Sequence, residues 1–233
     1  MLIYLNKILT IMNFKRIKRN LKWTNKFSFK PVVVSAGMPR SGSTLLYNII
    51  REILGQRFKN LASGWIDDIN QFPKGDSYLI KTHWISKYLI WRSKYIFYTF
   101  RDLRDVAVSA QRKFDRPVSI EKIKVDINEY LKAKKYSDMM IKYELMMQNP
   151  IEYIDKISDI LDVTVDSDSI YNKVMSIKPP INKSGYSKKT LLHNNHITNT
   201  KRGEWREILP QATISAIHNE FGWWFAENEY PLK

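Results

Sequence analysis

The sequence contains no cysteine, and this absence excludes three kinds of chemistry. The chain has no disulfide framework, no zinc site built from thiolates and no cysteine nucleophile. It also lacks a long apolar run at its start, because Leu2–Met12 is interrupted by Lys7 and is shorter than the roughly 20 residues that span a bilayer. A globular protein of a reducing compartment, and so a cytoplasmic location, is the simplest expectation.

Acidic residues are absent from the first thirty positions, although the whole chain has 23. This segment supplies more than half of the formal net charge of +15, through Lys7, Lys15, Arg16, Lys18, Arg19, Lys22, Lys26 and Lys30. We therefore expect a basic N-terminal extension over residues 1–30 and one domain over residues 31–233. Three interpretations of the extension remain open: weak contact with an anionic membrane surface, a frayed extension, or a chain whose true first residue is Met12.

Glycine is also scarce, with eight in 233 residues, yet Gly37 and Gly42 both stand in the stretch GMPRSGSTLL. Their spacing is that of a nucleotide-phosphate loop, but the lysine that normally follows the second glycine is missing. Backbone N–H groups of such a loop, followed by a helix N-terminus, bind an anion without a lysine. Arg40 adds a charged fork suited to phosphate or sulfate oxygens, and further donors are the hydroxyl groups of Ser41, Ser43 and Thr44.

Short apolar runs alternate with segments of helical periodicity. This pattern predicts an α/β fold: a single P-loop-like domain with a central parallel sheet and helices on both faces. The expected strands are Val32–Val34, Tyr78–Ile80, Tyr95–Phe100 and Met139–Tyr143. The expected helices are Leu45–Leu54 with Gly55 at its end, a helix after Arg101 with Asp102 as N-cap, and Asn149–Leu161.

Polar side chains follow two of these strands, at the positions where parallel sheets bind ligands. Lys81 and His83 come directly after Tyr78–Ile80, and Arg101 follows the longest run. A histidine can act there as a general base, because its ordinary pKa lies near neutrality. Lys81 projects to the same side of the strand as His83. Ser109 follows Arg101 by about two helical turns, so both could reach one phosphate group.

Several stretches, taken in order, resemble one enzyme family. PRSGSTLL, KTHW, RDLRDVAVSA and IKYELMMQNP are similar to motifs of the sulfotransferases that use 3′-phosphoadenosine 5′-phosphosulfate. Near the end, KRGEWREILP resembles the glycine-rich segment of the same family. The resemblance extends over about Val32–Leu209. Each motif alone is loose, and the ordered set is specific.

The resemblance implies a role for each matching residue and no metal ion. The 5′-phosphosulfate would be held by Arg40, Ser41, Gly42, Ser43 and Thr44, and the 3′-phosphate by Arg101 and Ser109 together with Lys201, Arg202 and Gly203. His83 would be the general base, Arg40 and Lys81 would stabilise the developing charge, and Glu144 is the alternative base. Leu45 stands where cytosolic members carry a tryptophan, so the adenine contact is not assigned.

The resemblance also implies an acceptor that bears a hydroxyl group, either a carbohydrate or a small molecule. We expect its contacts in residues 60–65 and 114–135, and we expect no nucleic-acid partner. Two alternatives remain. A nucleotide or small-molecule kinase would explain the glycine loop, although its lysine is missing. A basic nucleic-acid-binding protein would explain the charge, although the sequence shows no recognition-helix or zinc pattern.

Overall fold

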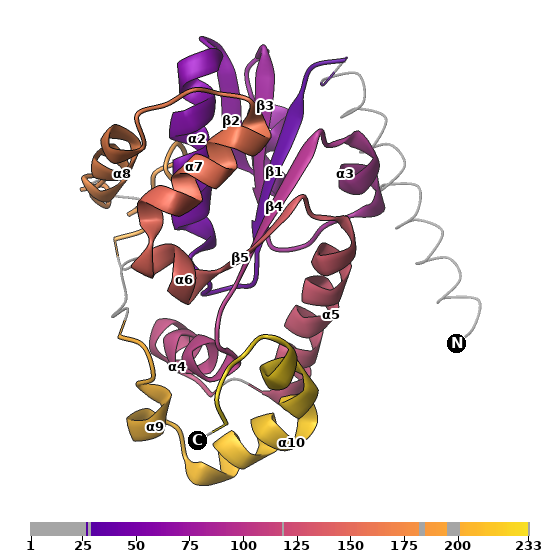
Figure 1. Ribbon diagram of the computed structural model, residues 1–233, viewed down its shortest axis with the longest axis vertical. Coiled ribbons are helices and arrows are strands. Elements are labelled where there is room, and N and C mark those ends of the chain that lie inside the picture. Colours follow the sequence, from indigo (N-terminus) through magenta and orange to yellow (C-terminus); the bar gives the residue numbers. More distant parts are fainter. Residues whose placement is uncertain (1–26, 28, 118, 182–184, 195–200, 233) are drawn as a thin grey trace.

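A five-stranded parallel sheet forms the centre of the protein, in a computed structural model that describes residues 27, 29–117, 119–181, 185–194 and 201–232 (Figure 1). The strand order is β2-β3-β1-β4-β5. This confirms the expected α/β domain with a central parallel sheet. The strands are β1 (Val32–Gly37), β2 (Leu61–Trp65), β3 (Ser77–Thr82), β4 (Tyr95–Phe100) and β5 (Met139–Lys142).

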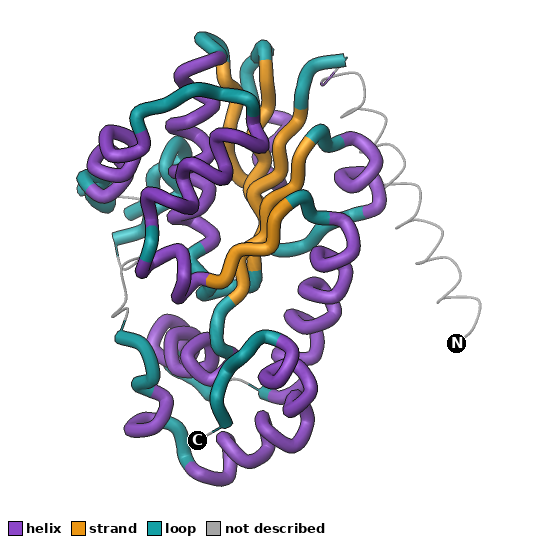
Figure 2. The backbone as a smooth tube through the Cα atoms, viewed as in Figure 1, coloured by secondary structure: helices purple, strands orange, loops and turns teal. Residues whose placement is uncertain are grey.

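Helices cover both faces of the sheet (Figures 1 and 2). One face packs against α2 (Ser43–Arg57), α7 (Pro150–Leu161) and α8 (Ser167–Met175). The other face packs against α3 (Lys87–Arg92), α4 (Leu103–Phe114), α5 (Ile120–Tyr136) and α10 (Gln211–Glu227). The shorter elements are η1 (Ile66–Gln71), α6 (Tyr143–Gln148) and α9 (Trp205–Ile208).

The apolar run in β1 is continuous because both of its faces are covered. Val32 and Val34 belong to the core under α3–α5 and α10, whereas Val33 belongs to the core under α2 and α7. Val34 pairs with Ile80 of β3 and Ile96 of β4, so three buried strands lie side by side. These three strands are the ones that their apolar runs predicted most directly.

The expected element ends differ from the observed ones in two places. Helix α2 continues past Gly55 to Arg57, where the Phe58 N–H still bonds to the Leu54 carbonyl. Strand β5 ends at Lys142, and Tyr143 begins α6. Asp102 caps α4 as expected, since its carboxylate accepts the backbone N–H of Arg104. The elements that were not predicted are strand β2 and the helices η1, α3, α5, α6, α8, α9 and α10.

The parallel register brings the polar strand ends together. Gly37 pairs with Thr99, and Ala36 pairs with Thr82, so β1, β3 and β4 end at nearly the same level. The loop after β1, His83 after β3 and Arg101 after β4 therefore lie at one edge of the sheet. This edge is where the candidate site is formed.

The core includes one residue of the expected N-terminal extension. Phe27 is completely buried, and its ring lies 4.9 Å from that of Tyr78. The Arg92 guanidinium donates to the carbonyls of Phe27 (3.1 Å) and Lys30 (2.8 Å). Residues 1–26, on which the membrane interpretation rested, lie outside the described residues. None of the helices in the described part of the chain combines the length and apolar character needed to cross a bilayer.

We predict that Phe27→Ala lowers the free energy of unfolding by about 3–5 kcal/mol, because it removes a fully buried aromatic ring. Phe29→Ala is the control, since the Phe29 side chain is fully exposed. Urea unfolding of both variants checks the prediction. Equal effects of the two substitutions would show that the domain starts after residue 30.

Candidate active site

A cavity of about 690 Å³ opens at the carboxyl edge of the sheet. Its wall is formed by the loop after β1, the start of α2, the ends of β2, β3 and β4, helices α4 and α6, and residues within 174–177 and 186–193. Most of the sequence-predicted site residues line it together: Arg40, Gly42, Ser43, Thr44, Lys81, His83, Arg101 and Ser109.

The loop after β1 has a backbone conformation that requires glycine at position 42. Gly42 has a φ of 78°, and a Cβ atom there would lie 2.5 Å from the ring of Tyr143. Arg40 has a φ of 68°, which costs about 1–3 kcal/mol for a residue other than glycine. Helix α2 then begins at Ser43 without a side-chain cap. Its first N–H groups, with Ser43 and Thr44 at the cavity wall, suit an anion.

Ser41 differs from the expectation that its hydroxyl binds a ligand. Its side chain is completely buried and does not line the cavity. The hydroxyl lies 2.6 Å from the Met38 carbonyl oxygen and 2.8 Å from the Thr99 hydroxyl, and the Ser41 N–H also bonds to Met38. Ser41 therefore fastens the loop to β4 rather than offering a donor to the cavity.

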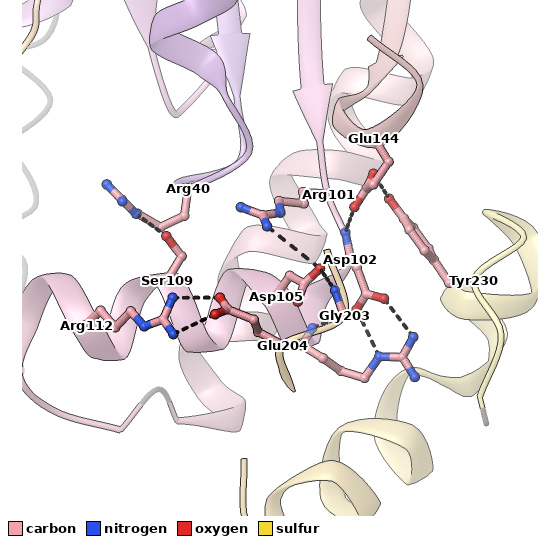
Figure 3. Close-up of polar contacts among 11 residues, drawn as sticks. Arg40, Arg101, Asp102, Asp105, Ser109, Arg112, Glu144, Gly203, Glu204 and Tyr230 are labelled. Carbon is pink, nitrogen blue, oxygen red and sulfur yellow. Dashed lines mark hydrogen bonds and ion pairs between the residues drawn. The ribbon is translucent and has the colours of Figure 1, made fainter. Parts of the chain in front are cut away.

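Arg40 connects the loop to α4 on the opposite wall. Its Nε donates to the Ser109 hydroxyl at 2.9 Å, and Figure 3 shows the two side chains meeting beside Arg101. Residues far apart in the sequence thus present a guanidinium and a hydroxyl group at one point of the cavity. The sequence predicted both residues as phosphate ligands, and the structure brings them into contact.

His83 is held in one tautomer by the backbone of β1. Its Nδ1 lies 2.7 Å from the Gly37 carbonyl oxygen; because a carbonyl can only accept, Nδ1 carries the proton and Nε2 keeps its lone pair. Burial, and next the charge of Lys81, lower the pKa of His83 to about 3, although the Gly37 bond opposes them. The expected near-neutral pKa is therefore wrong, and His83 is a neutral base at pH 7.

Lys81 lies next to His83 and is also buried, with 4% of its surface exposed. Its Nζ lies 4.8 Å from the centre of the Trp65 ring, and the same ring meets His83 edge-on at 5.2 Å. Burial lowers the pKa of Lys81 to about 7. Because this pKa is near neutrality, a neighbouring anion would stabilise the charged ammonium group.

Arg101 lies between the main cavity and a smaller one of about 210 Å³. Its guanidinium stands 4.7 Å from the centre of the Tyr143 ring, and Nη2 lies 3.8 Å from Asp105. Its buried Nε has no hydrogen-bond partner among the described residues. A buried donor without a partner is costly, so this arrangement suits a bound anion.

The three late residues of the predicted phosphate site have different surroundings. Arg202 lines the smaller cavity together with Arg101. The Gly203 N–H donates to the Asp105 carboxylate at 3.1 Å, and the Lys201 ammonium lies 3.6 Å from Glu207 at the surface. Only Arg202 therefore shares a cavity with Arg101 in this arrangement.

Residues 203–205 are fastened to α4. Glu204 accepts two hydrogen bonds from Arg112, at 2.7 and 3.1 Å (Figure 3). The Trp205 ring lies 3.8 Å from the guanidinium of Arg104, whose Nη2 and Nε bond to Asp102 at 2.7 and 2.9 Å. Asp102 thus pairs with the Arg104 side chain and caps the start of α4.

Glu144, the alternative base, is engaged elsewhere. It is 5% exposed and accepts hydrogen bonds from the Asp102 N–H (3.1 Å) and the Tyr230 hydroxyl (2.8 Å) (Figure 3). It lines the smaller cavity, whereas His83 lines the larger one. The geometry therefore indicates that Glu144 holds the C-terminal segment and does not act as the alternative base.

Sequence reasoning missed several cavity residues. Among the described residues of the two segments expected to contact an acceptor, only Trp65 and Phe114 line the cavity, and Asn60 instead bonds to Asp76. Tyr143 and Lys113 line it without having been assigned a role. The usable signal for Tyr143 was its place at the end of a predicted strand.

The chemistry available here is anion binding and proton transfer. Among the described residues, no three His, Asp or Glu side chains gather as a metal ion would require. Two cationic groups, around the β1–α2 loop and around Arg101, line the same cavity as a neutral histidine whose Nε2 can accept a proton. Such a site can hold a doubly anionic ligand and remove a proton from a second one.

Neither protein-family models nor curated protein sequences give a match to the chain. Solved structures do match. Mouse sulfotransferase SULT7A1 complexed with PAP is 15% identical over 82% of each chain, with a TM-score of 0.63. Retinol dehydratase with retinol and PAP is 13% identical over 83% of this chain and 81% of its own, with a TM-score of 0.57.

Retinol dehydratase in complex with androsterone and the inactive cofactor PAP is similar to the same degree. Its identity is 13% over 83% of this chain and 80% of its own, with a TM-score of 0.56. At such low identities the likeness concerns the fold alone. The chain therefore has a sulfotransferase-like fold.

We predict that Lys81→Met raises the thermal unfolding temperature, and that this gain depends on pH. The pKa of Lys81 is about 7 in the folded protein, against an ordinary value of about 10.4. Its buried charge therefore destabilises the fold fully below pH 7, and this penalty disappears as pH rises toward 10.4. Unfolding temperatures at pH 6, 8 and 10 test this, with the exposed Lys59→Met as control. A gain that stayed constant with pH would contradict it.

Proposed function

We propose that this protein is a sulfotransferase that moves a sulfuryl group from 3′-phosphoadenosine 5′-phosphosulfate to an acceptor hydroxyl. The observation that carries the proposal is the convergence of His83, Arg40 and Arg101 on one cavity. Each comes from a different strand end, and together they provide a base and two anion sites. The fold shared with PAP-bound structures supports the proposal.

The co-substrate would lie along the carboxyl edge of the sheet. N–H groups at the start of α2, with Ser43, Thr44 and Arg40, would hold the 5′-phosphosulfate. Arg101, with Ser109 and Arg202, would hold the 3′-phosphate. The unpartnered Nε of Arg101 supports this assignment. Fixed cations and amides provide the countercharge, so the arrangement does not depend on a metal ion.

The transfer then follows from the positions of the side chains. The acceptor hydroxyl gives its proton to Nε2 of His83, while its oxygen forms a bond to sulfur. The bond between sulfur and the bridging oxygen breaks, and the electron pair stays on the phosphate of the departing adenosine 3′,5′-bisphosphate (PAP). Arg40 and Lys81 stabilise the charge that grows on the bridging oxygen.

The cavity wall favours a small molecule over a carbohydrate as acceptor. Its only side-chain amide is that of Asn48 among the described residues, and both amide hydrogens donate to the carbonyls of Thr44 and Thr190. Recognition of a sugar ring needs several free polar groups, and of this amide only Oδ1 has no hydrogen-bond partner among the described residues. The rest of the wall beyond the anion sites is largely apolar, through Leu45, Met147, Val174, Met175, Ile177, Leu191 and Leu192.

The structure offers no observation that favours the kinase alternative. The loop has no lysine, and Asp102, which could have held magnesium after β4, bonds to Arg104 through both of its oxygens. The nucleic-acid alternative rested on the net charge, of which more than half lies in residues 1–30. A cytoplasmic location and a weak membrane contact by the extension stay predictions.

We predict that PAP raises the thermal unfolding temperature in the presence of EDTA. A ligand bound only by the native state must stabilise it, and the loop amides and arginines provide countercharge without magnesium. Thermal shift across a PAP titration measures this. Absence of a shift at saturating PAP, together with a shift for magnesium-ATP, would favour the kinase.

We also predict that one variant loses turnover and another loses PAP affinity. His83→Ala should lower turnover by about 10²-fold or more, the usual effect of a positioned base, with little change in PAP affinity. Arg101→Ala should weaken PAP binding by about 1.5–3 kcal/mol, because it removes a charged hydrogen bond. Isothermal titration with PAP and initial rates with one working acceptor measure both effects.

Adenosine 5′-phosphate provides the control for Arg101→Ala, since it lacks the 3′-phosphate and its affinity should fall less. Normal turnover by His83→Ala would place the base elsewhere. Equal losses of PAP and adenosine 5′-phosphate affinity in Arg101→Ala would mean that Arg101 supports the loop instead of the 3′-phosphate.

A further inference from the structure

Two tryptophans and a tyrosine at α3 lie outside both cavities. Trp91 is 72% exposed, and Trp84, two residues before the N-cap Ser86, is 50% exposed. Tyr88 lies about one turn before Trp91, and the two rings are 6.0 Å apart. Single exposed apolar side chains are normal, whereas a group of them is typical of a surface that contacts a partner.

The chain enters the domain beside the same helix. Arg92, the neighbour of Trp91, donates to the carbonyls of Phe27 and Lys30. Phe29, which lies between these two residues, is fully exposed. A fourth aromatic ring is therefore attached near the end of α3, at the point where the basic extension joins the domain.

Positive charge accompanies these rings. Lys87 and Lys94 are exposed, and Lys87 stands four residues before Trp91, on the same side of the helix. Residues 77–101, which include α3, contain no Asp or Glu. The basic extension adds further lysines and arginines and no acid.

Two acidic side chains bond to the backbone on either side of α3 and offset part of this charge. Glu129 of α5 accepts the Ile85 N–H at 3.0 Å, but it also pairs with Lys132. Asp138 accepts the Ile96 N–H at 2.7 Å. The lysines near α3 and those of the extension outnumber these carboxylates, so the surface keeps a net positive charge.

This combination suits a lipid surface better than a protein or a nucleic acid. Tryptophan and tyrosine rings favour the boundary between water and an apolar phase, and lysines near it bind anionic headgroups. Protein interfaces are depleted of lysine, whereas Lys87 lies on the same side of the helix as Trp91. Single-stranded nucleic acid also stacks on aromatic rings, but the apolar run Leu2–Met12 in the extension favours lipid.

We propose that this surface docks the protein on an anionic lipid membrane. The rings would enter the headgroup region, and the lysines and the basic extension would bind the headgroups. The docking residues are Phe29, Lys30, Trp84, Lys87, Tyr88, Trp91 and Lys94. The inference extends to the folded domain a contact that the sequence indicated for the extension alone, and it does not depend on sulfuryl transfer. Because the Trp84 ring lies 6.1 Å from that of His83, docking would bring the candidate base close to lipid.

Co-sedimentation of the full chain with vesicles measures the binding. Vesicles of phosphatidylcholine with about 30% phosphatidylserine should bind wild type about 10-fold or more tightly than phosphatidylcholine alone. Trp84→Ala combined with Trp91→Ala should weaken binding by about 10-fold or more, because two rings no longer enter the interface. Lys87→Gln combined with Lys94→Gln should weaken it by about 25-fold, since each lysine near an anionic surface contributes roughly 5-fold.

Matched controls change the same residue types elsewhere. Trp223→Ala removes a tryptophan of α10 that is 47% exposed. Lys59→Gln combined with Lys178→Gln removes two exposed lysines next to α2 and α8, which cover the opposite face of the sheet. Both controls should bind vesicles like wild type. Thermal unfolding checks that every variant is folded, and all the changed side chains are exposed.

Several results would overturn the inference. Equal binding by wild type and both surface variants would mean that the extension alone carries the contact. Equal losses in the surface variants and the controls would mean that binding is not specific to α3. If wild type did not bind anionic vesicles, self-association or binding of a single-stranded oligonucleotide would assign the surface to that partner instead, and binding only after deletion of residues 2–26 would assign it to the extension. None of these measurements involves turnover, so they leave the sulfotransferase proposal unaffected.

Discussion

The buried ion pair between Arg104 and Asp102 holds together the side of the cavity that Arg101 lines. Arg104 is 1% exposed and lies between the rings of Trp205 and Phe225, at 3.8 and 4.6 Å. It also donates to the carbonyl of Pro231. One side chain therefore connects the start of α4, the segment after residue 200 and the C-terminal segment. Removing one partner of such a pair costs about 3–5 kcal/mol, because the other charge stays buried. The position of Arg101, three residues before Arg104, depends on this support.

Neighbouring residues near the cavity have two different roles: one fixes the backbone, and the other lines the cavity. In the loop after β1, Ser41 faces the interior while Arg40 and Gly42 face the cavity. At the start of α4, Asp102 holds the helix while Arg101 faces the ligand side. Each of these cavity-lining residues thus has a neighbour, turned away from the cavity, that fixes its backbone. Such support allows charged groups to keep their geometry as charge moves during a reaction.

The sequence predicted those parts of the fold whose signal is local. The apolar runs of β1, β3 and β4 are continuous because the strands are buried on both faces, and their polar ends indicated the site. Strand β2 was missed because its sequence, LASGW, has no apolar run. The direction of Ser41 depends on Thr99, far away in the sequence, and no spacing rule reports it. The low pKa of His83 likewise depends on its burial and on Lys81.

The close contact between Gly42 and Tyr143 has a consequence for how this chain can evolve. The Tyr143 ring occupies the space where any side chain at position 42 would lie, and the same ring supports Arg101. A change at either position therefore alters the surroundings of both the β1–α2 loop and Arg101, which are proposed to hold opposite ends of the co-substrate. Variation at these two positions should be correlated among related sequences. A smaller residue without a ring at position 143 would leave space for a side chain at position 42, but it would also remove the ring that contacts Arg101.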